Sequence, residues 1–350
     1  MNEFVSIEIL GTIAGCSAII TLLTQVFKKY LPEKLDTKWL ALLFSVIIGV
    51  LRIVYVGQFD FAGITSGIIN IFVLLSIYRR WGIKKILTEE ILMDKRIGAQ
   101  YYTIKDFIKT IEDFDASCKK IRDIGYKIVQ ISKCPLPAKE IKEVLDKYGL
   151  EVVLTHRVFD DFQADVKEII DYNKTLACQI CGLGIMPAKF YQSKEGVMEF
   201  IKEMKPICDA IKDAGLYFAY HNHTIEFLKY DNKFVYDYLV EETDPEIFNF
   251  TVDTYWCQIS GVDTIRLIEK LGKRAMVLHY KDLQIARDEK GKYSPKITEV
   301  GNGNLDWEAI TAAGERAGSR YAVVEQDICP GDPFDSLKSS YDYLTTKGFI

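Results

Sequence analysis

Histidine is scarce in this sequence: only four occur among 350 residues, and none precedes position 150. A basic excess is also missing, since the formal net charge is −5. A sequence-independent nucleic-acid binder needs a basic face, so we expect no nucleic-acid partner. No glycine-rich loop or run of arginines marks a phosphate site. With 27% charged and 49% hydrophobic residues, disordered and collagen-like classes are excluded.

Cysteine is present but not concentrated. The eight cysteines are scattered through a large chain, which excludes a small disulfide scaffold. The one CxxC motif, Cys178 to Cys181, lies in an apolar run typical of a strand and is weak evidence for zinc. A reducing, cytosolic setting fits this usage best.

The charge divides unevenly along the chain. Residues 1–92 carry nine basic and seven acidic residues, giving +2, which leaves 35 and 42 in residues 93–350, giving −7. The first part contains uncharged runs at 9–27 and 61–78, and a third apolar run at 39–59 interrupted only by Arg52. Runs of this length predict an N-terminal all-α membrane segment of about three transmembrane helices.

Basic residues flank these runs on one side. Lysines follow the first run and arginines follow the last, so three spans would place both groups in the cytoplasm. We therefore expect an inner or cell membrane protein with the rest of the chain on the cytoplasmic side. A buried helical hairpin of a soluble protein is the alternative interpretation.

Residues 1–86 resemble small phage-holin-like membrane proteins. The resemblance depends on the opening MNEFVSIEILGTIAGCSAIITLLTQVFKKYLP, the two closely spaced spans that follow and a basic tail. It implies oligomerisation in the bacterial inner membrane, and hence a homo-oligomer. Residues 87–95 are predicted to be a linker. Within it, Met93-Asp94-Lys95-Arg96 is typical of a protein start, and translation from Met93 would leave the remainder in the cytoplasm.

From residue 96 to 350 short apolar runs alternate with amphipathic stretches, which predicts strands followed by helices. The predicted strands are 97–102, 127–132, 151–156, 177–185, 217–223, 248–253, 275–282 and 321–327. The predicted helices are 104–124, 138–148, 165–172, 194–214, 232–242, 263–271, 307–317 and 333–345. Eight such units at this length predict an α/β fold, a (β/α)₈ TIM barrel. The polar insertion 283–303 is predicted to be a long functional loop, in which Gly301 and Gly303 allow a close turn over the mouth.

All four histidines fall at the predicted carboxyl ends of strands, the rim where barrels of this kind hold their active sites. His156 ends the third strand, His221 and His223 the fifth, and His279 the seventh. Asp253 ends the sixth strand and Glu325 the eighth. Imidazole and carboxylate together suit a divalent cation such as Mn, Co, Mg or Zn, so we predict a metal site at this rim.

Residues 93–350 resemble the sugar phosphate isomerase/epimerase group of xylose isomerase-like TIM barrels. The resemblance depends on segments in order along the chain: IGAQYYT, IGYKIVQIS, GLEVVLTH, YHNHTIEF, VDTYW, LHYKD, VGNGNLDW and VVEQD. It implies a metal held by Asp253, His279 and Glu325. The family usually has a glutamate as the fourth ligand, where this chain has His221. Either His221 binds the metal, or Glu226 folds back to bind it.

The resemblance implies a metal-dependent sugar isomerase or epimerase that abstracts a proton next to a carbonyl through a metal-stabilised enediolate. Its substrate would be a keto-sugar or a sugar phosphate. Glu325 or Glu226 is the predicted base, and His223 or His156 the predicted acid. Lys281 could supply positive charge to the enediolate. Histidine in place of the family glutamate argues against symmetric two-base epimerisation and favours a one-base enolisation or a dehydration.

Aromatic side chains are predicted to cover the carbohydrate substrate. Tyr101, Tyr102 and Trp256 are the candidates for this wall, and Glu299 in the polar insertion could reach into the mouth. One alternative function is an inosose-type dehydratase or a 3-keto-glycoside lyase on the same barrel. The other is a holin-like membrane protein that carries the barrel as a fused passenger.

Overall fold

The computed structural model describes residues 93–287 and 289–350. They belong to the second of two compact units into which the chain divides, Ile91–Ile350. The predicted spans at 9–27, 39–59 and 61–78 lie outside the described residues. Within the described ranges, no helix combines the length and the apolar character needed to cross a membrane.

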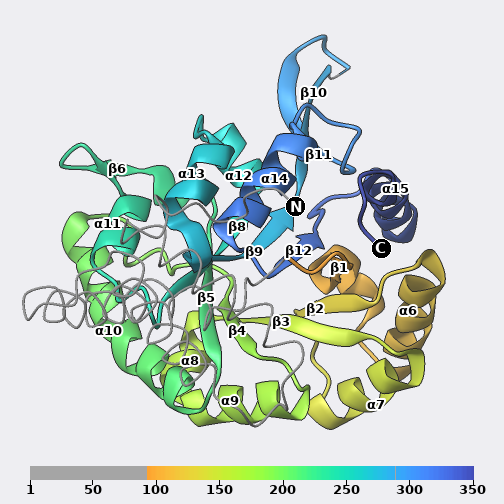
Figure 1. Ribbon diagram of the computed structural model, residues 1–350, viewed down its shortest axis with the longest axis horizontal. Helices are drawn as coiled ribbons and strands as arrows, with labels where there is room; N and C mark the ends of the chain where they lie inside the picture. Colours follow the sequence, from red (N-terminus) through yellow and green to blue (C-terminus); the bar gives the residue numbers. More distant parts are fainter. Residues whose placement is uncertain (1–92, 288) are drawn as a thin grey trace, which may run out of the picture. The chain divides into compact units, whose positions relative to one another are not determined.

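Eight parallel strands close into a barrel in the order β1-β12-β9-β8-β5-β4-β3-β2, which confirms the predicted (β/α)₈ barrel (Figure 1). The strands are β1 (Ile97–Gln100), β2 (Ile128–Ser132), β3 (Glu151–Arg157), β4 (Ile180–Leu183), β5 (Tyr217–His221), β8 (Asn249–Asp253), β9 (Ala275–Tyr280) and β12 (Tyr321–Val324). Each strand pairs with the next in parallel register, so all eight carboxyl ends meet at one rim.

Helices surround the barrel (Figure 1). They are α6 (Ile111–Ile124), α7 (Ala138–Tyr148), α8 (Phe159–Ala164), α9 (Val166–Thr175), α10 (Lys194–Asp213), α11 (Val235–Glu241), α12 (Thr254–Ile259), α13 (Thr264–Leu271), α14 (Trp307–Ala317) and α15 (Pro333–Thr346). Short 3₁₀ segments are η2 (Tyr101–Phe107), η3 (Ile225–Phe227) and η4 (Gly272–Arg274). Their apolar faces form one large core between the helices and the barrel.

The barrel interior is filled at its amino-terminal end. Ile128, Ile180 and Met276, at or near the starts of three strands, pack with five other residues into a separate apolar cluster. The carboxyl end instead holds buried polar side chains. The interior is therefore a packed core below and a polar site above.

The predicted helix 104–124 is wrong in its first part. Tyr101–Phe107 forms η2, and Ile108 has a non-helical backbone (φ −137°, ψ 29°). The α-helix begins only after Thr110, whose side chain accepts a hydrogen bond from the Asp113 amide. This side-chain cap satisfies a free amide at the new start, so the segment divides into two helices.

Three other segments also differ from their predictions. The helix 165–172 is replaced by α8 and α9, because Asp165 caps α9 and stops its predecessor. The helix 232–242 is shortened to α11 by a small hairpin, β6 (Lys229–Tyr230) and β7 (Lys233–Phe234). The predicted loop 283–303 contains an antiparallel hairpin, β10 (Asp282–Arg287) and β11 (Tyr293–Thr298), that projects from the barrel (Figure 1).

Candidate active site

Four buried side chains at the strand ends converge on one point. They are His221 at the end of β5, Asp253 at the end of β8, His279 in β9 and Glu325 directly after β12, and we call them the four-residue cluster. One nitrogen or oxygen of each lies within 4.8 Å of the others. His279 Nδ1 is 2.8 Å from Glu325 Oε2, and His221 Nε2 is 3.3 Å from Asp253 Oδ2.

The far nitrogen of each cluster histidine faces an acceptor. His221 Nδ1 is 3.0 Å from the Gly184 carbonyl, which can only accept, so Nδ1 carries the proton. His279 Nε2 is 2.7 Å from Gln130 Oε1, and the other end of that amide donates to Ser132 at 3.4 Å. The hydrogen-bond network thus assigns a proton to His279 Nε2 as well. Both rings turn their other nitrogen toward the cluster carboxylates, as metal-binding histidines do.

Lys281 lies against the carboxylates of this site. Its buried Nζ is 2.9 Å from Asp253 Oδ2, 3.0 Å from Glu325 Oε2 and 3.0 Å from Asp327 Oδ2. Burial lowers the pKa of Lys281, but the three carboxylates outweigh it and raise the pKa overall. Burial raises the pKa of Asp253 and Glu325, but Lys281 and the histidines reverse this and hold both pKa values below their ordinary range.

The histidines titrate differently because their partners differ. Burial lowers the pKa of His221, but the hydrogen bond to Asp253 and the charge of Glu325 raise it overall. Burial lowers the pKa of His279 and holds that of His156 well below its ordinary value. Burial also lowers the pKa of His223, to about 3. His156, His223 and His279 are therefore neutral near pH 7.

The donor set fits a divalent cation. Three carboxylates and one ammonium, with neutral histidines, leave a formal charge of −2 in a buried space. Two imidazole nitrogens and two carboxylates are a common ligand set for Mn, Co or Zn, and their far sides are already held in place. A cation and the His221 Nε2 proton would satisfy the same oxygens, so binding would displace that proton.

A cavity of about 320 Å³ opens over the cluster. Its lining includes His221 and Glu325 from the cluster, and Asp327 beside Lys281. The remaining wall comes from the ends of β1 to β5 and the loops that follow them: Gln100, Tyr102, Ser132, Lys133, His156, Arg157, Val158, Gly184, Ile185 and His223. Polar atoms from several strands therefore converge on a space of the size that small-molecule sites have.

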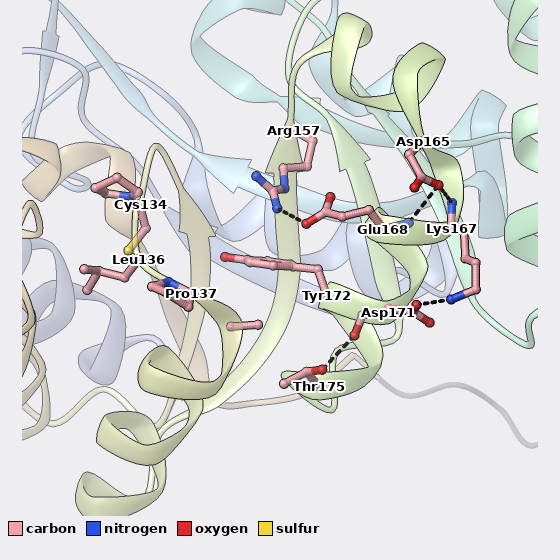
Figure 2. Close-up of a pocket in the computed structure, with 12 residues that line it drawn as sticks. Cys134, Leu136, Pro137, Arg157, Asp165, Lys167, Glu168, Asp171, Tyr172 and Thr175 are labelled. Carbon is pink, nitrogen blue, oxygen red and sulfur yellow. Dashed lines mark hydrogen bonds and ion pairs between the residues drawn. The ribbon is translucent and has the colours of Figure 1, made fainter.

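A second hollow, of about 670 Å³, lies outside the β3 strand and shares Arg157 with the first (Figure 2). It is lined by the loop Cys134–Ala138 and by α9. Its charges pair with one another: Arg157 with Glu168 at 3.3 Å, and Lys167 with Asp171 (Figure 2). The Arg157 guanidinium also lies 4.1 Å from the centre of the Tyr172 ring. We call this second space the outer hollow.

Glu226 lies apart from the four-residue cluster. It is fully buried, accepts a hydrogen bond from the Tyr220 hydroxyl and accepts another, at 2.6 Å, from the His223 amide. Both carboxylate oxygens are thus occupied by the turn that follows β5. Of the two residues predicted for the fourth ligand position, the structure places His221 with Asp253, His279 and Glu325.

The predicted aromatic wall divides. Tyr102 lines the cavity, whereas Tyr101 lies in the core with 0% exposure, against Phe114 and with its hydroxyl 3.3 Å from Cys118 Sγ. The chain enters η2 at residue 101, so these neighbours face different directions. Trp256 packs on His223 with 5.4 Å between ring centres, and Lys281 Nζ lies 5.3 Å from its ring.

Two other predicted residues have clear positions. His156 lines the cavity with its ring 5.2 Å from that of His221. Glu299 accepts hydrogen bonds from Ser336 at 2.7 Å, Gln326 at 3.3 Å and Thr298 at 3.0 Å, and is not among the lining residues. Glu299 ties the end of the β10–β11 hairpin to α15 and does not reach into the mouth.

Sequence reasoning missed Gln130 and Asp327. Gln130 is a buried amide within the apolar run KIVQIS, and that mismatch was an available signal. Asp327 stands two residues after Glu325, and alternate residues of an extended segment share a face. Asp282 was also missed. It accepts from Gly301 at 2.9 Å, Gly303 at 3.2 Å and Trp307 at 2.7 Å, and so organises the VGNGNLDW segment.

Comparison with known proteins supports the same part of the chain. The family model described as xylose isomerase-like TIM barrel matches residues 118–345. An inosose dehydratase of Geobacillus thermodenitrificans is 24% identical over 246 residues, covering 61% of this chain and 82% of that protein. An inosose dehydratase of Lacticaseibacillus casei is 23% identical over 270 residues, covering 66% of this chain and 88% of that protein.

Solved structures share the fold. A sugar phosphate isomerase/epimerase from Parabacteroides distasonis superposes with a TM-score of 0.60 at 19% identity, covering 73% of this chain and 94% of that one. A xylose isomerase-like TIM barrel protein from Mycobacterium smegmatis, in complex with magnesium, gives a TM-score of 0.58 at 14% identity, covering 72% of this chain and 95% of that one. At these identities the likeness extends to the fold alone.

Proposed function

Because the chain belongs to the xylose isomerase-like TIM barrel family, we propose that residues 96–350 are a divalent metal-dependent isomerase acting on a keto-sugar. The reaction class is proton abstraction next to a carbonyl. The observation that carries this proposal is the four-residue cluster, buried beneath a cavity of about 320 Å³. Asp253, His279, Glu325 and His221 would hold the metal. When bound, it would polarise the substrate carbonyl as a Lewis acid.

Glu325 is the proposed base. Its Oε2 contacts His279 and Lys281, while its Oε1 makes no hydrogen bond within the described residues. That oxygen belongs to a cavity-lining side chain and is available to take a proton from substrate. Lys281 fixes the carboxylate and adds positive charge near the oxygen that becomes anionic.

The acid is assigned to the opposite wall. His156 and His223 both line the cavity, and each has a buried ring nitrogen without a partner among the described residues. Either could pass a proton to a substrate oxygen through that nitrogen. The lining carboxylates Glu325 and Asp327 come from one strand end, which fits a one-base enolisation better than two bases on opposite faces.

The inosose dehydratase relatives favour a second candidate on the same site. Those proteins match over most of their length, and their name denotes loss of water from a keto-inositol. Proton abstraction is common to both candidates, and they differ in whether a hydroxyl then leaves. A dehydration creates an absorbing enone, whereas an isomerisation conserves mass.

The experiment assays the full chain after chelator treatment, with and without Mn²⁺, Co²⁺, Mg²⁺ or Zn²⁺, on keto-sugars and inosose. We expect turnover that depends on the added metal, with mass spectrometry and ultraviolet absorbance separating the two products. Metal-independent turnover, or no turnover of any polyhydroxylated ketone, would overturn the proposal.

We also propose that residues 1–86 anchor the chain in a membrane. The support is the uncharged runs at 9–27 and 61–78 and their basic flanks, which lie outside the described residues. Alkaline carbonate extraction of native membranes tests this. Release of full-length protein into the supernatant, or a single barrel-sized product beginning at Met93, would contradict the anchor.

A further inference from the structure

Two buried glutamines lie side by side at the site. Gln100 ends β1, Gln130 lies in β2, and the two are direct partners in the parallel register. Gln100 is 1% exposed and Gln130 is 0% exposed. The pair offers an internal comparison, because the same amide group has the same neighbours along the barrel wall.

Gln130 uses both ends of its amide. Its Oε1 faces His279 at 2.7 Å and its Nε2 donates to Ser132 at 3.4 Å. Gln100 uses only one end. Its Oε1 accepts from the Tyr102 amide at 3.2 Å, and its buried Nε2 has no partner within the described residues.

The orientation of the Gln100 amide is fixed by its backbone partner. A flipped amide would set an NH₂ group against the Tyr102 N–H, so the oxygen must face Tyr102 and the nitrogen must face away. A buried donor left unpaired costs about 1–3 kcal/mol, and native proteins contain few of them. This donor therefore calls for a partner outside the chain.

The partner's place is the cavity over the cluster. Gln100 lines that cavity, as do His156, Arg157 and His223. These four residues supply four of the nine buried unpaired polar atoms in the described part of the chain. Their concentration at one cavity points to a ligand with several oxygens.

We propose that Gln100 is a specificity-determining residue whose Nε2–H donates a hydrogen bond to one oxygen of a polyhydroxylated substrate. The proposal rests on the proposed function, since it assumes a substrate in the cavity. It separates two tasks in adjacent strands: Gln130 orients a cluster histidine, and Gln100 reads a substrate oxygen. A site with a buried unpaired donor discriminates strongly against an analogue that lacks the matching oxygen.

The test compares Gln100→Met with Gln130→Met in the full chain, using 2-keto-myo-inositol and its mono-deoxy analogues. We expect Gln100→Met to raise KM about 10- to 100-fold, with kcat within a few-fold of wild type and unchanged Mn²⁺ affinity by calorimetry. One deoxy analogue should lose as much with wild type, and Gln100→Met should show no further loss with it. Gln130→Met should instead weaken Mn²⁺ binding.

An unchanged KM in Gln100→Met, or a loss of Mn²⁺ affinity equal to that of Gln130→Met, would overturn the proposal. Melting curves confirm that both variants fold. If wild type turns over no ketone, the proposed function fails, and calorimetry with unreactive myo-inositol tests Gln100 independently. Weaker myo-inositol binding by Gln100→Met supports the proposal, while equal binding, or none by wild type, overturns it.

Discussion

The two hollows that share Arg157 place charge in opposite ways. The outer hollow is the larger, about 670 Å³ against 320 Å³, and its acids and bases are exposed and paired along one helix (Figure 2). The smaller cavity covers carboxylates and an ammonium that are almost wholly buried. Buried charge is costly, so a fold keeps it where it does work. Volume is therefore a poorer guide to the active site than desolvated charge.

The largest expected effect comes from removing a carboxylate in each place. Asp253→Asn keeps the side-chain shape, including the oxygen that accepts from the Trp256 amide at 3.0 Å, but removes a cluster charge. We expect kcat/KM to fall about 10³-fold and Mn²⁺ binding to be lost. Steady-state kinetics and calorimetry measure both.

The matched control is Asp171→Asn in the outer hollow, which removes an exposed partner of Lys167. We expect wild-type kinetics and metal affinity from it, because exposed helix pairs contribute little. Equal losses in the two variants would erase the distinction between the hollows.

Removing a lysine from each place should separate the hollows by stability. Lys281→Met leaves Asp253, Glu325 and Asp327 without their shared ammonium. We expect chelator-treated protein to lose about 3–5 kcal/mol of unfolding free energy, measured by urea denaturation. Lys167→Met should cost at most about 0.5 kcal/mol. A small loss in Lys281→Met would show that the buried ammonium is dispensable.

A subtler change targets the support of one cluster histidine. Gln130→Leu removes the acceptor that faces His279 Nε2 without touching the four ligands themselves. We expect Mn²⁺ affinity to fall about 10- to 100-fold, as is usual when the outer partner of a metal-binding histidine is lost. Thr175→Val, beside Asp171 in the outer hollow, is the control and should bind Mn²⁺ as wild type does. Unchanged affinity in Gln130→Leu would contradict the assigned orientation of the ring.

The sequence predicted the fold well where local signals and tertiary packing agree. Helices 138–148 and 307–317 match α7 and α14, because a glycine in left-handed conformation follows each, Gly149 and Gly318. The prediction failed where one polar side chain set a boundary, as Thr110 and Asp165 do. Such caps compete with an apolar pattern that continues through them.

The site was predictable to the extent that it depends on topology. Parallel strands end at one rim, so residues at strand ends, such as His221 and Glu325, could be brought together without coordinates. The partners that orient them could not. Gln130 and the Gly184 carbonyl act across the barrel, at sequence separations that no local pattern records. Tyr101 and Tyr102 differ because the strand ends one residue earlier than alternation suggests.

The smallest expected effect concerns a carboxylate between the two extremes, half-buried Glu299. Burial raises its pKa, but the hydrogen bonds from Ser336, Gln326 and Thr298 outweigh this and lower the pKa overall. A depressed folded-state pKa contributes stability that is present above the unfolded-state pKa and lost as pH falls through the folded-state value. Glu299→Gln should therefore be less stable than wild type at pH 7, by no more than about 1 kcal/mol after solvent screening.

That difference should shrink between pH 5 and pH 3 (about one unit to either side of the ordinary glutamate pKa), because wild type loses the contribution that the variant never had. Ser336→Ala removes the donor at 2.7 Å and should reproduce part of the effect without removing a titrating group. Urea denaturation at several pH values measures all three proteins. A constant difference at every pH would mean that Glu299 stabilises the hairpin by packing, and that its charge is as inconsequential as those of the outer hollow.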